Sequence, residues 1–247
     1  MTLVCCTLYV MTPPITIPSH IQTIVWDLDG TLLDSFGIYR DCLNEVLQKL
    51  GKPEVPEVVL RHNHHGFIED SIANALKEAG QKLTKNELAR VIHDFYILNN
   101  AFIKDVDHQL FEDAIDLAYQ AHQSGKQQIV VTNRPHGTER GKGSPRNLVA
   151  NSRLHGFIDY ILCGDDSSYR KPHRQFLEAR FGSDLADLGE VIVIGDQFVD
   201  AELARNLGCN AILVIRAKKI VHLDRIGQWQ GFVQIVPSLR SVQIAGG

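Results

Sequence analysis

The segment WDLDGTLLDS, residues 26–35, places three carboxylates directly after a short apolar run that is predicted to end a buried strand. They belong to Asp27, Asp29 and Asp34. Like charges held so close together repel, and each raises the pKa of the others unless a cation lies between them. The segment therefore indicates a metal site, a reacting phosphate group, or both.

Other side chains suited to phosphate chemistry follow three further apolar runs. Thr132 and Asn133 follow the run QIVV, Lys171 comes after DYILC, and Asp196 and Asp200 come after EVIVI. Taken singly each is weak evidence, because an Asp after a strand is often a helix cap and a Lys is usually solvated. Parallel strands share one edge at their carboxyl ends, so we expect these side chains to converge there.

The elements that must position these groups fall into two kinds. Apolar residues at helical spacing predict helices over 39–50, 68–79 and 84–102, the last opened by a capping box of Thr84 and Glu87. No strand pattern occurs between about residue 36 and residue 106. This segment is therefore expected to be a helical insertion.

From Phe111 onward the pattern alternates between helix and strand. Strands are predicted over 128–132, 159–163, 190–195, 211–215 and 232–236, and helices are predicted over 111–125, from Ser144, from Pro172 and over 199–207. Near-continuous apolar strands separated by helices are typical of a doubly wound parallel sheet in an α/β fold. We expect a core of residues 21–35 and 107–247, with residues 36–106 as an inserted all-α cap.

The composition is that of an ordinary globular protein, with 247 residues, 44% hydrophobic residues, 22% charged residues and a net charge of −4. This acidic balance argues against a nucleic-acid partner. Five cysteines without a CxxC spacing indicate neither a disulfide framework nor a zinc knuckle, so a cytoplasmic location is expected. Residues 1–20 carry an apolar run too short to span a bilayer, and they are predicted to be a loose N-terminal extension without membrane contact, a targeting role being the alternative.

The motifs DLDGT, VVTN, RKP and GDQFVD resemble, in order, the four motifs of the haloacid dehalogenase-like (HAD) superfamily, over about residues 21–216. The helical insertion resembles the cap of its phosphoglycolate phosphatase-like branch. The resemblance implies that Asp27 is a nucleophile that forms an aspartyl-phosphate and that Asp29 is the general acid and base. It also implies that Mg²⁺ is held by Asp27, Asp196 and the backbone carbonyl of Asp29.

The same resemblance assigns the remaining motif residues. Thr132, through its hydroxyl, and Asn133, through its backbone N–H, would hold phosphoryl oxygens, while Lys171 would supply a positive charge. Asp200 would orient Lys171 or a metal-bound water, and its alternative is an acid favoured at a helix N-terminus. Asp34 is expected to cap a helix. The motif around the lysine departs from the family pattern, because KPHR lacks a second proline.

Two loops are candidates for substrate specificity. The segment RHNHHGF, residues 61–67, is predicted to be a loop between two cap helices, where His62, His64 and His65 would be solvated, contact substrate or bind a second metal. The enlarged loop 136–146 carries Arg140 and Lys142, which would contact an anionic substrate. Its alternative role is that of a plain connector.

The sequence favours a magnesium-dependent phosphatase acting on a small-molecule phosphate monoester. A sugar-phosphate mutase shares every core motif and stays an alternative. A dehalogenase or a phosphonate-cleaving relative would be expected to lack the second acid, which is present as Asp29. From other classes, a phospho-accepting receiver domain would have no reason to carry a helical lid, and a binding module would be expected to have lost motif residues. The identity of the substrate and the oligomeric state do not follow from the sequence.

Overall fold

A computed structural model describes residues 14–64, 68–102, 106–136, 144–216 and 231–245. Its elements, in chain order, are β1 (Ile15–Ile17), β2 (Thr23–Trp26), α1 (Ser35–Lys49), α2 (Glu57–Asn63), α3 (Ile68–Glu78), α4 (Lys85–Phe102), η1 (Val106–Gln109), α5 (Glu112–Gln123), β3 (Gln127–Val131), α6 (Pro145–Ala150), β4 (Tyr160–Leu162), α7 (Gln175–Phe181), η2 (Ala186–Leu188), β5 (Val191–Gly195), α8 (Phe198–Leu207), β6 (Asn210–Val214), β7 (Val233–Val236), η4 (Leu239–Ser241) and β8 (Val242–Ile244). Among the helices of these ranges, none combines the length and the apolarity needed to cross a membrane.

Six strands form a parallel sheet in the order β4-β3-β2-β5-β6-β7. At its centre, Trp26 of β2 pairs with Val130 of β3 on one side and with Ile194 of β5 on the other. This register brings the residues that follow these three strands to the same level of one sheet edge. The predicted α/β fold with a doubly wound parallel sheet is confirmed.

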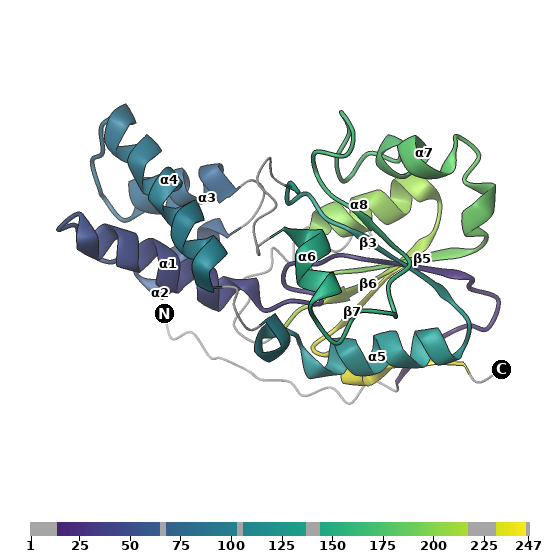
Figure 1. Cartoon of the computed structure of the whole chain (residues 1–247). Coiled ribbons are helices and arrows are strands. Elements are labelled where there is room, and N and C mark those ends of the chain that lie inside the picture. Colours follow the sequence, from purple (N-terminus) through teal and green to yellow (C-terminus); the bar gives the residue numbers. More distant parts are fainter. Residues whose placement is uncertain (1–13, 65–67, 103–105, 137–143, 217–230, 246–247) are drawn as a thin grey trace.

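Both faces of the sheet are buried. Ile24 and Trp26 belong to a hydrophobic core that also contains α5 residues, whereas Val25 points into a second core with residues of α7 and α8. Figure 1 shows α5 below the sheet and α7 and α8 above it. Burial on both faces explains why the strands are apolar at successive positions instead of at alternate ones.

Helices α1 to α4 pack around a hydrophobic core of their own. Buried side chains from all four contribute, among them Leu43, Leu60, Ile72 and Phe95. In Figure 1 these helices form a group to one side of the sheet. The predicted capping box is present, because the backbone N–H of Thr84 donates to Glu87 Oε2 at 2.8 Å and that of Glu87 donates to Thr84 Oγ1 at 3.2 Å.

The N-terminal segment corrects one expectation. Residues 15–17 are not loose, because they form β1, which pairs in parallel with β8 in a separate two-stranded sheet. Ile17 is fully buried in the core beneath the main sheet. The two strands come from opposite ends of the chain and have three residues each, so neither carries a local pattern long enough to predict.

Two helices also differ from expectation. The short helix α2 was not predicted, because Leu60 is the only apolar side chain that it buries and no helical stripe is visible in its sequence. Helix α7 begins at Gln175 and not at Pro172. The remaining predicted strands and helices are observed within a few residues of their expected limits.

Candidate active site

Asp27 is the first residue after β2, and its backbone N–H donates to the carbonyl of Ile194 in β5 at 2.8 Å. Its side chain is buried. Oδ1 accepts a hydrogen bond from Lys171 Nζ at 2.5 Å, and Oδ2 accepts one from the Thr31 hydroxyl at 3.3 Å. The carboxylate is thus held from two sides, by a lysine far along the chain and by the turn that follows the strand.

Lys171 is buried and its ammonium also donates to Asp200 Oδ1 at 2.7 Å. Burial acts to lower the pKa of Lys171, but the negative charges of Asp200 and Asp27 outweigh it and hold the pKa above its ordinary value. The lysine is therefore charged. Its ammonium lies between the carboxylates of Asp27 and Asp200 and donates a hydrogen bond to each.

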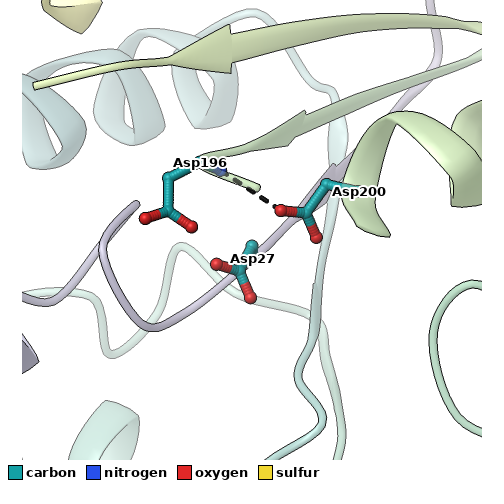
Figure 2. A group of neighbouring side chains, drawn as sticks. All are labelled: Asp27, Asp196 and Asp200. Atoms are coloured by element: carbon teal, nitrogen blue, oxygen red, sulfur yellow. Dashed lines mark hydrogen bonds between the residues drawn. The ribbon is translucent and has the colours of Figure 1, made fainter. Parts of the chain in front are cut away.

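The carboxylates of Asp27, Asp196 and Asp200 gather at the sheet edge, with one oxygen of each within 4.8 Å of the others. Figure 2 shows the three side chains around a common space, with Asp200 at the start of α8. Burial raises the pKa of Asp27 well above its ordinary value; the charge of Lys171 opposes this rise, while Asp200 and Asp196 add to it. The structure thus concentrates negative charge around Asp27.

This cluster fits a divalent cation. The ammonium of Lys171 contacts two of the three buried carboxylates, those of Asp27 and Asp200, and Asp196 adds a third carboxylate beside them. Carboxylate oxygens are the ligands that a hard ion such as Mg²⁺ prefers. Gly30 keeps the approach open, because a Cβ at this position, where φ is +86°, would collide with Asp196 Oδ2.

The side chain of Asp200 both contacts Lys171 and lies at the N-terminus of α8, so it agrees with both roles expected for this residue. Its Oδ1 accepts from Lys171, while its Oδ2 accepts from the backbone N–H groups of Gln197 at 3.0 Å and Asp196 at 3.2 Å. These two bonds to Oδ2 cap α8, and they also fix the carboxylate that binds Lys171. Asp34 stands at the N-cap of α1 as expected, although its side chain makes no capping hydrogen bond.

Thr132 and Asn133 follow β3 at the same edge. Thr132 is buried, and its hydroxyl oxygen accepts from the backbone N–H of Arg134 at 3.0 Å. The Asn133 side chain accepts from the backbone N–H of Lys171 at 2.9 Å and donates to its carbonyl at 3.2 Å. Sequence reasoning did not foresee this amide bridge, which holds the backbone of Lys171 on both sides of its Cα.

Asp29 points to a different partner. Its carboxylate accepts from Nε of Arg134 at 3.0 Å and also from Nη2 of Arg134. Arg134 is a residue that the sequence reasoning passed over. The signal was present, because Arg134 directly follows Thr132 and Asn133 and any residue there must lie near the carboxyl end of β3.

Of the histidines expected on a loop of the helical segment, His62 lies in a helix and His64 follows that helix. His62 lies in the last turn of α2, where its Nδ1 is 2.9 Å from Glu78 Oε2 of α3. This corrects its assignment to a loop. His64 follows the helix and packs on Tyr39, with ring centroids 4.7 Å apart. His65 lies outside the described residues.

The loop after β3 is described at its two ends. The backbone N–H of His136 donates to Asp165 at 2.6 Å, and Arg146 pairs with Asp166 at 2.7 Å. Arg140 and Lys142 lie outside the described residues. Their expected contact with an anionic substrate stays a prediction.

Comparison with known proteins agrees with this geometry. A phosphoglycolate phosphatase of Vibrio parahaemolyticus is 28% identical over 195 residues, which cover 76% of this chain and 81% of that protein. A similar protein of Caulobacter vibrioides, also named phosphoglycolate phosphatase, is 24% identical over 196 residues, with 78% of each chain covered.

Solved structures share the fold. CbbY of Rhodobacter sphaeroides, in complex with xylulose-1,5-bisphosphate, superposes with a TM-score of 0.65 at 17% identity, covering 91% of this chain and 97% of that one. A magnesium-bound HAD-type protein of Bacillus subtilis gives a TM-score of 0.65 at 17% identity and covers 90% of this chain and 96% of that one. The family model of the haloacid dehalogenase-like hydrolases matches residues 24–214. Because this match spans most of the chain, the chain belongs to the haloacid dehalogenase-like hydrolases.

Proposed function

We propose that this protein is a magnesium-dependent phosphatase that hydrolyses a small-molecule phosphate monoester through an aspartyl-phosphate on Asp27. The observation that carries the proposal is the buried carboxylate of Asp27, held by Lys171 and Thr31 beside Asp196 and Asp200. A nucleophile fixed in this way can meet phosphorus in one orientation.

In the first half-reaction an oxygen of Asp27 forms a bond to phosphorus while the bond from phosphorus to the ester oxygen breaks. Asp29 donates a proton to the departing oxygen, so the alcohol leaves neutral. In the second half-reaction Asp29 takes a proton from water, the water oxygen bonds to phosphorus, and the bond to Asp27 breaks. Inorganic phosphate and the free carboxylate of Asp27 result.

Asp27, Asp196 and the backbone carbonyl of Asp29 are proposed to hold Mg²⁺. When bound, the ion would supply positive charge that keeps the clustered acids ionised and neutralises phosphoryl oxygens. The gathering of three buried carboxylates supports this assignment, because without a further cation the raised pKa of Asp27 would weaken it as a nucleophile.

The transferred phosphoryl group is proposed to lie between the ends of β2 and β3. The Thr132 hydroxyl and the backbone N–H of Asn133 would donate to its oxygens, and the Lys171 ammonium would balance charge that builds up on Asp27 and phosphate. The amide bridge from Asn133 to Lys171 supports this arrangement, because it fixes the lysine relative to the end of β3.

We propose that the helical segment, residues 36–106, acts as a cap that admits substrate and excludes water. Its separate hydrophobic core and its position beside the sheet edge support this division from the core of residues 21–35 and 107–247. The residues proposed to contribute to substrate specificity are His62, His64, His65, Arg140 and Lys142. The names of the curated relatives make 2-phosphoglycolate the first ester to test.

The test is release of inorganic phosphate by purified protein from a panel of phosphate monoesters, with Mg²⁺ and with chelator. We expect magnesium-dependent turnover of wild type and none of Asp27→Asn, whose amide keeps the shape of the carboxylate but cannot attack phosphorus. Isomerised sugar phosphate in place of free phosphate would make the protein a mutase. A stable stoichiometric phosphoprotein without turnover would make it a switch.

A further inference from the structure

Arg134 and Asp29 form a forked ion pair at the mouth of the site. Nε and Nη2 of Arg134 donate to the two separate carboxylate oxygens of Asp29. The two side chains are 21% and 24% exposed, so the pair borders on solvent and a small molecule can reach it. Forked bonds between guanidinium and carboxylate are among the stronger polar contacts in proteins.

In this pair Arg134 binds the carboxylate of Asp29, which the proposed reaction needs as acid and base. A general acid and base must bring an oxygen within hydrogen-bond reach of the ester oxygen and then of water. Asp29 has both oxygens engaged by Arg134, so it has to release at least one of these bonds before it can serve. A substrate that supplies a replacement carboxylate to Arg134 would make this release favourable.

Arg134 is placed to receive such a group. Its backbone N–H donates to the Thr132 hydroxyl oxygen, so the guanidinium extends from the turn that is proposed to hold phosphate. Burial raises the pKa of Tyr96 in α4, as does its hydrogen bond to Glu69, while the charge of Arg134 acts in the opposite direction. Arg134 therefore lies just after β3 and close enough to α4 for its charge to act on Tyr96.

Lys171, the other cation described at this site, is not available to bind a substrate carboxylate. Lys171 is buried and bound to Asp27 and Asp200, both parts of the proposed catalytic cluster. The partner of Arg134 is instead a carboxylate in a forked geometry, which is the geometry that a substrate carboxylate would adopt. In this structure the side chain of Asp29 stands in for that group.

We propose that Arg134 binds a carboxylate carried by the substrate next to its phosphate ester, and that this exchange frees Asp29 to act as acid and base. This inference rests on the proposed phosphatase function and deepens it. The substrate class is then a phosphate monoester of a short hydroxy acid. Esters without the second anion leave Asp29 bound to Arg134 and are turned over slowly.

The test compares two esters of the same carbon number, 2-phosphoglycolate and 2-hydroxyethyl phosphate, on wild type and Arg134→Met. We expect the variant to lose about 10²-fold in kcat/KM for 2-phosphoglycolate, in line with the loss of a charged hydrogen-bonding partner. We expect its kcat for the hydroxyethyl ester to rise, because Asp29 is no longer held. The matched control is Arg153→Met, which removes a forked pair with Glu112 on the surface.

A second measurement needs no variant. Acetate titrated into wild type should occupy Arg134 and speed turnover of 2-hydroxyethyl phosphate in a saturable way, while it should inhibit turnover of 2-phosphoglycolate by competition. In Arg134→Met both effects of acetate should vanish.

Equal losses for the two esters in Arg134→Met, or no effect of acetate on wild type, would overturn the exchange and leave Arg134 as a structural residue. Those results leave the proposed phosphatase standing, since wild type would still release phosphate in magnesium. Absence of phosphate release from every ester of the panel by wild type would instead remove the proposed function, and the inference with it.

Discussion

Lys171 is expected to be the side chain whose loss most disturbs the acid cluster. Replacing it with methionine keeps the length of the side chain and removes the ammonium that donates to Asp27 at 2.5 Å and to Asp200 at 2.7 Å. Asp27 and Asp200 then lose their ammonium partner within a cluster of three buried carboxylates. The change therefore tests the electrostatics of the site by stability alone, with no substrate needed.

The expected cost follows from burial. Removing one partner of a buried ion pair costs about 3–5 kcal/mol, because the charge left behind stays desolvated. For a chain of this size 1 kcal/mol corresponds to about 2–4 °C in Tm, so Lys171→Met should lower Tm by about 6–20 °C in chelator. Magnesium should recover more stability in the variant than in wild type, because it restores the missing positive charge.

The pH dependence has a definite sign. The pKa of Asp27 is raised in the folded protein, so the folded state holds more protons than the unfolded state and stability falls as pH rises from about 4 toward the raised value. Without Lys171 the cation that opposed this rise in pKa is gone, so the fall in stability continues to higher pH and its total is larger. The difference in stability between wild type and variant should therefore be small in acid and large at neutral pH.

The assay is urea unfolding followed by circular dichroism, at several pH values, with chelator and with magnesium. The matched control is Lys126→Met, which removes a buried lysine whose Nζ donates to the neutral carbonyl of Ile21 at 2.6 Å. It should cost about 1–3 kcal/mol for an unsatisfied carbonyl, with little dependence on acid pH or on magnesium. A Lys171→Met protein within 1 kcal/mol of wild type at neutral pH in chelator, or a cost that does not shrink in acid, would refute the reasoning.

Three further outcomes are expected. Asp29→Asn should slow phosphate release by about 10²–10⁴-fold while the protein unfolds as wild type does, and an unchanged rate would remove Asp29 from proton transfer. Calcium in place of magnesium should inhibit turnover, because its longer and more variable coordination would misplace Asp27, so full activity in calcium would contradict the proposed role of the metal. Gly30→Ala should lower both Tm and magnesium affinity measured by calorimetry, because φ is +86° and the added Cβ would strike Asp196; wild-type values for both would show that the turn can adapt.

The sequence by itself determined the main sheet and the side chains at its edge. Apolar runs ending in Asp27, Thr132 and Asp196 could be placed together, because parallel strands joined by right-handed crossovers must end on one side. The capping box of Thr84 and Glu87 was likewise readable, since its two partners lie three residues apart. Such features depend on local periodicity and on a topology with few alternatives.

Only the tertiary structure decided how these groups meet. The bonds from Asn133 to Lys171 and from Arg134 to Asp29 join residues 38 and 105 positions apart, and no local pattern encodes them. The pairing of β1 with β8 likewise depends on bringing the two ends of the chain together. Side-chain partners at such separations are selected by the packed backbone, which sets which donor reaches which carboxylate. The acids proposed to be catalytic could therefore be named from the sequence, while the pairing of Arg134 with Asp29 could not.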